Sequence, residues 1–97
     1  MKEIGLIRER HALIMLFHMQ EDWDSFEDIL STLMRFFKAH LIKRMDGAES
    51  KFVIIKINET ELTLINNPYG NSLKAETDES QEILKRVYED WNLFSKL

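Results

Sequence analysis

The chain has 97 residues, which leaves room for one domain over 1–97. Its 44% hydrophobic and 31% charged content exclude a disordered chain and indicate a globular protein with a single core. The lack of Cys excludes a disulfide framework, an Fe–S cluster, a thiolate zinc site and a Cys nucleophile, and the net charge of −4 disfavours nucleic acid as a partner.

The first segment with a clear pattern is HALIMLFHM at 11–19, in which both alternating faces are apolar. A strand that is buried on both sides has this pattern, so we expect a central strand here. Residues 3–8, EIGLIR, are expected to pair with it as a short edge strand. The apolar run is too short to span a bilayer, and Glu3, Glu9 and Arg10 interrupt a signal-peptide pattern. We therefore expect a cytoplasmic protein without a membrane partner.

The segment 25–44 has the apolar spacing of three and four residues that a buried helical stripe produces. Asp24 and Glu27 stand at the spacing of a capping box, and two bases suit the last turn. The sequence therefore predicts a helix from Ser25 to about Arg44.

The second half of the chain predicts three strands and a helix. KFVIIKIN at 51–58 alternates apolar residues to one face, and ELTLINN at 61–67 follows after a short turn, so the two form a hairpin. SLKAET, from Ser72, is expected as a third, shorter strand. A second helix is expected to begin at Thr77 or Asp78, with the capping-box spacing of Asp78 and Gln81, and to run nearly to the C-terminus.

These elements predict an α+β domain in two layers. We expect a mixed or antiparallel sheet of four to five strands with two helices on one face, in the order β(β)-α-β-β-β-α. The other face would display Phe52, Ile54, Ile65 and alternate residues of 12–18. A bare apolar sheet face often marks an interface. Two other interpretations stay open: the N-terminal segment folds across this face, or a few scattered apolar residues carry no meaning.

The loop NNPYGNS, 66–72, holds the only Pro and one of the three Gly residues. Asn67, Pro68 and Gly70 suit the positions of a type I turn, so a corner in the fold accounts for each special residue. Tyr69 is also a candidate anchor for a partner, because Tyr supplies contact area at a low entropic cost. Both interpretations can hold together.

Two acidic runs accompany the predicted helix starts, EDWDSFED at 21–28 and ETDESQE at 76–82. Carboxylates there complement the helix dipole, and the same groups can form a surface that steers a basic partner. That surface is concentrated if both helix starts lie at one end of the sheet. Trp23 is either a hydrophobic staple or a half-exposed aromatic beside the carboxylates. With Tyr69, the candidate partner-binding residues are Glu21, Asp22, Trp23, Asp24, Asp28, Asp78 and Glu79.

No catalytic or metal-binding constellation emerges from the sequence. His11 and His18 would point to opposite faces of a strand, His40 stands on the predicted helix, and no Ser occupies a nucleophile elbow. We expect no catalytic residue, no metal and no cofactor, and therefore a protein that is not an enzyme. The bases of RFFKAHLIKR, 35–44, are the one feature that favours nucleic acid or anionic lipid, unless they pair with nearby acids.

In size, acidity, lack of Cys and lack of a catalytic constellation, the chain resembles bacterial immunity proteins that neutralise secreted or contact-delivered toxins. The resemblance covers the whole chain in general character and matches no motif, so no residue role is carried over. It implies a non-enzymatic protein-binding domain whose acidic groups occlude the basic active surface of a cognate toxin. The alternative is a homodimeric bacterial domain that pairs two open sheet faces. The segment ELTLINNPYGNSLKAETDES followed by a helix is similar to small bacterial domains that end in a hairpin and a helix.

Overall fold

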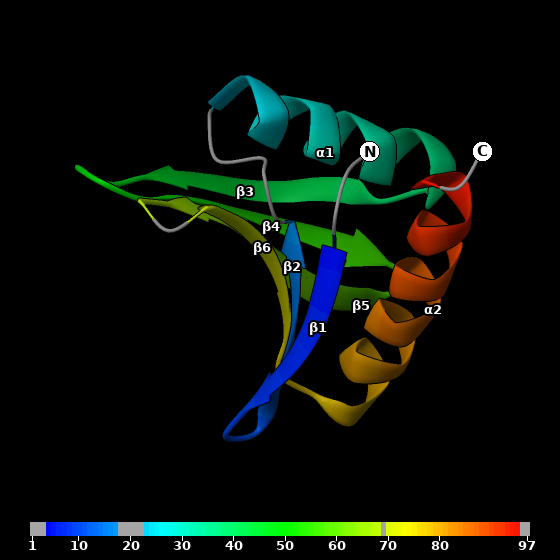
Figure 1. The fold of residues 1–97 in the computed structure, drawn as a ribbon. Helices are drawn as coiled ribbons and strands as arrows, with labels where there is room; N and C mark the ends of the chain where they lie inside the picture. Colours follow the sequence, from blue (N-terminus) through cyan, green and yellow to red (C-terminus); the bar gives the residue numbers. More distant parts are fainter. Residues whose placement is uncertain (1–3, 18–22, 69, 96–97) are drawn as a thin grey trace.

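The computed structural model describes residues 4–17, 23–68 and 70–95 (Figure 1). In this part of the chain, six strands and two helices follow one another in the order ββαββββα. Their bounds are β1 (Ile4–Glu9), β2 (Ala12–Phe17), α1 (Trp23–Phe36), β3 (His40–Asp46), β4 (Lys51–Ile57), β5 (Thr60–Asn67), β6 (Gly70–Ala75) and α2 (Asp78–Ser95). The α+β class is as the sequence predicted, but the sheet has six strands where four to five were expected.

The sheet is antiparallel throughout, with the strand order β1-β2-β6-β5-β4-β3. β2 lies between β1 and β6 and is almost entirely buried, so the prediction of a central strand with an edge strand beside it is confirmed. Because residues 4–17 are themselves part of the sheet, they do not fold across its face. This removes one of the interpretations that the sequence left open.

The predicted helix over 25–44 is wrong in its second half. α1 ends at Phe36, and 40–46 form the edge strand β3. The carbonyl of Leu33 accepts hydrogen bonds from the backbone N–H groups of both Phe37 and Ala39, each at 3.1 Å, which closes the last turn. Lys38 has a φ of 57°, the left-handed conformation that usually belongs to Gly after a helix. The backbone conformation of Lys38 therefore ends the helix, although the residue type at this position does not indicate a helix end.

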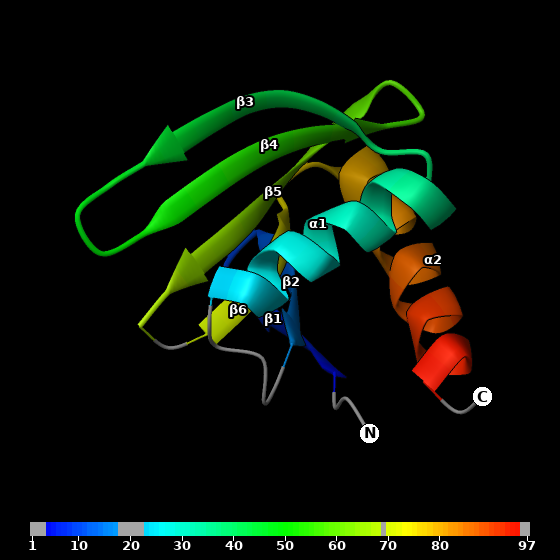
Figure 2. The ribbon, with the colours of Figure 1, turned by 90° about the horizontal axis from the view of Figure 1, so that it is seen from above.

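Both helices pack on the same face of the sheet (Figures 1 and 2). Buried side chains from both helices and from the inward-facing strand positions form one continuous core. At its centre the ring of Trp91 packs edge-on against Phe17, with ring centroids 5.0 Å apart, and stacks on Phe37 at 6.0 Å. The core is thus built on one side of the sheet, and the second side lies opposite both helices.

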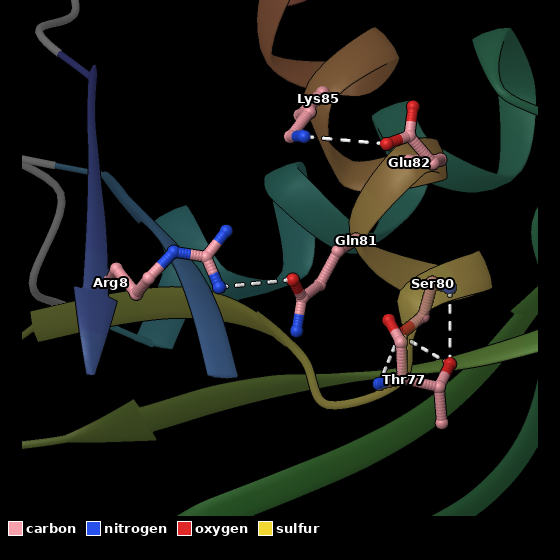
Figure 3. Close-up of polar contacts among 6 residues, drawn as sticks. All are labelled: Arg8, Thr77, Ser80, Gln81, Glu82 and Lys85. Carbon is pink, nitrogen blue, oxygen red and sulfur yellow. Dashed lines mark hydrogen bonds and ion pairs between the residues drawn. The ribbon is translucent and has the colours of Figure 1, made fainter. Parts of the chain in front are cut away.

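The start of α2 is capped by Thr77 and Ser80 (Figure 3). The N–H of Ser80 donates to Oγ1 of Thr77 at 3.1 Å, and the N–H of Thr77 donates to Oγ of Ser80 at 2.9 Å. The predicted capping pair of Asp78 and Gln81 is therefore wrong. Gln81 points instead to the turn between β1 and β2, where its Nε2 donates to the carbonyl of His11 at 2.6 Å, and its Oε1 accepts from Nη1 of Arg8 at 3.1 Å.

Neither helix in the described ranges combines the length and the apolar character that crossing a lipid bilayer requires.

Candidate protein interface

The acidic candidate residues that the structure describes do not lie on one surface. Asp28 is exposed on α1, and Asp78 and Glu79 are exposed in the first turn of α2. α1 begins at the left of Figure 1 above the strands, whereas α2 begins near the bottom, and Figure 2 also separates the two starts. The two helix starts therefore lie at different places over the sheet, because the two helices cross the sheet in different directions.

The other predicted residues lie partly outside the described structure. Glu21, Asp22 and Tyr69 are outside the described residues, and so are the side chains of Trp23 and Asp24. Whether Trp23 acts as a staple and whether Tyr69 acts as an anchor both stay predictions.

The loop at 66–72 serves as a corner in the fold. Asn67 pairs with Gly70 across the end of the β5–β6 hairpin, and Gly70 has a φ of 126°, a conformation that residues with a side chain rarely adopt. In the next pair of the same hairpin, Nδ2 of Asn66 donates a hydrogen bond to Oδ1 of the buried Asn71 at 2.6 Å. The Gly at position 70 is thus explained by the geometry of the hairpin.

The sheet face turned away from both helices carries two cross-strand rows of side chains, and we call it the open face. The first row, from β1 to β3, is Ile7, Ile14, Lys74, Thr63, Ile54 and Lys43. The second row is Gly5, Leu16, Ser72, Ile65, Phe52 and Met45. Seven of these twelve positions hold Ile, Leu, Phe or Met, whereas a sheet face in contact with water is normally polar. Phe52, Ile54 and Ile65 stand on this face, as the sequence predicted.

The open face is only partly shielded by its own neighbours. Phe52, Ile54 and Ile65 are half-buried, and Ile7 and Met45 keep 43% and 37% of their surface exposed. No described helix or loop covers them, since both helices pack on the opposite face. An apolar surface that is continuous over several strands is uncommon on a monomer and suits a contact with another protein.

Charged groups border the apolar rows on the open face. Glu9 stands beside Ala12 at the β1 end, and Glu61, Lys56 and His40 are adjacent on β5, β4 and β3. Glu9 also lines a shallow hollow of about 260 Å³ with Arg10, His11, Ala12, Lys74 and Glu76. The β3 end of the face therefore carries bases, and the β1 end carries groups of both signs.

The edge strand β3 is a second distinctive surface, which the sequence prediction missed. Each of its seven residues is exposed, although the strand contains Leu41, Ile42 and Met45. Arg44 donates to Oε2 of Glu27 on α1 at 2.6 Å, which ties the strand to the helix. This hydrogen bond raises the pKa of the Arg44 guanidinium above its usual value. No Gly or Pro separates α1 from β3 in the sequence, so the local signal that would have revealed the strand is weak.

The histidines do not meet in the described structure. His11 lies in the exposed turn between β1 and β2, His40 begins β3, and His18 lies outside the described residues. Over 4–17, 23–68 and 70–95, no group of three or more His, Asp or Glu side chains is arranged to hold a metal ion.

The comparison with protein families shows where this chain belongs. Residues 3–88 match the model of the family DUF3630, which is described as a protein of unknown function. The match covers most of the chain, so the chain belongs to the DUF3630 family. Neither the curated proteins nor the solved structures contained a match to this chain.

Proposed function

We propose that this DUF3630 domain is a non-enzymatic protein-interaction domain that forms a homodimer through the open face. One observation carries the proposal: helices cover the sheet on one side, while the other side holds seven large apolar residues in two adjacent rows, all of them at least partly exposed except the buried Ile14. Removing that surface from water is favourable by about 25 cal/mol for each Å² buried.

The dimensions of the open face suit a dimer. Five inter-strand steps of about 4.8 Å and six residues of about 3.3 Å make a face of roughly 24 Å by 20 Å. This flat area of roughly 480 Å² is more than half of the roughly 800 Å² per partner that a standard interface buries. Two sheets that pack face to face lie about 10 Å apart with their strands roughly aligned.

A two-fold axis parallel to the strands makes the face complementary to itself. This axis places β1 and β2 of one copy opposite β3 and β4 of the other, so that Ile14 and Leu16 meet Ile54 and Phe52. It also brings Glu9 of one copy towards His40 and Lys56 of the other, which gives opposite charges at both rims. The same surface patch is then used by both copies, as a two-fold interface requires.

Analytical ultracentrifugation of two matched variants tests the proposal. Ile65→Glu places a carboxylate at the centre of the open face on β5 and should leave only monomer, because an unpaired charge would be buried. Leu93→Glu makes the same change at an apolar residue of α2 that is 62% exposed, and it should leave the dimer intact. A wild-type protein that sediments as a monomer at all concentrations would overturn the proposal.

An inhibitor of a basic toxin is a second proposal, which the net charge of −4 favours. The acidic candidate residues that the structure describes lie on two separate surfaces: Asp28 is on α1, and Asp78 and Glu79 are at the start of α2. A complex with a toxin would therefore use the start of one helix alone. Reversing the charge at Asp28 should then slow association with a basic toxin domain at low salt, and the same reversal at Asp78 should have no effect. A protein that is monomeric and binds such a domain would favour this second function over the first.

A further inference from the structure

The free edge of β3 differs from the rest of the molecular surface. β3 pairs with β4 on one side only, so its second edge presents unpaired backbone N–H and C=O groups. All seven residues from His40 to Asp46 are exposed, which corresponds to about 23 Å of extended chain. The opposite edge strand, β1, is more shielded at its start, where Ile4, Gly5 and Leu6 are half-buried.

Most of the exposed large apolar residues in the described ranges belong to β3 or to the end of α1. Seven large apolar residues are exposed in the described parts of the chain, and only Ile7 and Leu93 lie elsewhere. The other five belong to the end of α1 or to β3, and they are Met34, Phe36, Leu41, Ile42 and Met45. Phe36 and Ile42 are the most exposed of the five, at 58% and 48%. This concentration indicates a contact surface, because exposed apolar residues are otherwise scattered singly.

The same region carries several exposed basic residues, although the net charge of the protein is −4. We define the basic edge as Arg35 in the last turn of α1, Lys38 in the connection, and His40 and Lys43 on β3. All four are exposed, and none of them forms an ion pair within the described ranges. The nearby Arg44 is paired with Glu27, and Asp46 stands at the far end of the strand. The basic edge therefore attracts a negatively charged partner.

The irregularity of β3 restricts what can pair with it. The register shifts between Leu41 and Lys43, so the strand is regular only from Lys43 to Asp46. Lys residues and bulges on an edge discourage pairing with a second copy of the same strand, because like charges then stand opposite each other. An acidic strand does not meet this repulsion, and its carboxylates stand opposite bases.

We propose that the free edge of β3 binds an extended acidic segment of a partner protein, which adds a seventh strand to the sheet. The backbone of Lys43–Asp46 supplies the strand pairing, and the acidic residues of the segment are attracted by the basic edge, of which Lys43 lies in this stretch and the other members lie towards α1. Apolar residues of the segment contact Ile42 and Phe36. Strand addition occurs in the plane of the sheet, so this site adjoins the open face and shares Lys43 with it.

Fluorescence anisotropy with a labelled peptide, Asp-Val-Glu-Ile-Asp-Val-Glu, tests strand addition. The peptide should bind saturably and protect the amides of 43–46 from hydrogen exchange. Two control peptides separate the contributions: one has Asn and Gln in place of the acids, and the other is N-methylated at alternate residues. Both should fail to bind. Equal binding by the N-methylated peptide, or no binding by the acidic peptide, would overturn the proposal.

Matched charge reversals distinguish the effect of the basic edge on peptide affinity from the effect of the overall net charge. The double variant Arg35→Glu with Lys38→Glu should weaken peptide binding by about tenfold or more, because two attractions become repulsions. Lys85→Glu reverses an exposed base on α2 and should leave the affinity unchanged. Equal weakening by Lys85→Glu would show that only the overall charge matters and would contradict the site. Ile65→Glu, which targets the open face, should still bind the peptide.

Discussion

Gln81 of α2 and His11 in the β1–β2 turn are joined by a hydrogen bond of 2.6 Å, although 70 residues separate them in the chain. Gln81 is 8% exposed, and it also accepts a hydrogen bond from Arg8 (Figure 3). A single amide thus satisfies a backbone carbonyl and fastens the N-terminal hairpin to the second helix. The hairpin needs this attachment because β1 has a strand neighbour on one side only.

Gln81→Ala should lower the free energy of unfolding by about 1–3 kcal/mol, because the carbonyl of His11 loses its partner in a half-buried position. Urea denaturation followed by circular dichroism measures the change. Glu82→Ala is the matched control on the next residue, where the exposed pair with Lys85 contributes at most about 0.5 kcal/mol. Equal effects of the two substitutions would contradict the role given to Gln81.

Lys38→Gly should stabilise the protein by about 0.5–1 kcal/mol. Lys38 has a φ of 57°, a conformation that costs a residue with a side chain about 1–2 kcal/mol. Gly removes this cost, but it loses more conformational entropy on folding, which offsets part of the stabilisation. Lys38→Ala keeps the strain and should give no gain. Thermal unfolding of the three proteins checks the order, and an unchanged midpoint for the Gly variant would show that the helix end carries no strain.

Arg44→Ala should lower the free energy of unfolding by about 1 kcal/mol or less, because both partners of its pair with Glu27 are more than a third exposed. The effect should shrink at about 1 M salt, where charges are screened within about 3 Å. Since the folded state raises the pKa of Arg44, its contribution is complete below the unfolded pKa and is lost only as strongly alkaline pH is reached. Stability measured at neutral and mildly alkaline pH should therefore show the same difference between the two proteins.

Thr77→Ala and Ser80→Ala should each cost about 1 kcal/mol, because each hydroxyl accepts one backbone N–H at the start of α2. The double variant should cost less than the two single changes together, since the pair is reciprocal. A double-mutant cycle in urea measures this difference. Strict additivity would mean that the two hydroxyls cap the helix independently.

The midpoint of thermal unfolding should rise with protein concentration if the open face pairs two copies, because association stabilises the folded state by mass action. The Ile65→Glu variant should lose this dependence, whereas Leu93→Glu should keep it. A midpoint that is constant for the wild-type protein over a wide range of concentration would count against the homodimer.

The parts of the fold that the sequence predicted are those with strong periodicity. Val53, Ile55 and Ile57 alternate to one face, and β4 places all three in the core. Leu84, Val87 and Trp91 follow the helical period, and α2 buries all three. In both segments the local pattern and the tertiary packing agree, so the pattern alone was sufficient.

The region from 36 to 46 could not be predicted because its pattern suits two structures. Leu41 and Ile42 continue the apolar stripe of a helix, yet they also fit an edge strand. The left-handed residue that ends α1 is Lys38, and its side chain gives no hint of that conformation. Because of this error, the bases His40 and Lys43 and the exposed apolar residues Leu41 and Ile42 were placed on a helix face instead of a strand edge.

The separation of the two helix starts could not be predicted, for a different reason. The sequence placed Asp28 and Asp78 near helix starts correctly, but the direction in which each helix crosses the sheet depends on contacts between distant residues. The open face was predictable because its existence follows from two features of the sequence. These are the presence of two helices and the alternation of apolar residues along each strand.

The strand order pairs a strand near the beginning of the chain with a strand that is synthesised much later. Leu13 of β2 pairs with Ala75 of β6, 62 positions further on, and β6 itself pairs with β5. During synthesis the first hairpin must therefore wait, with one side unpaired, until the fifth and sixth strands have emerged from the ribosome. Such non-local pairing slows folding, because the long intervening chain must be brought together before β2 can pair with β6.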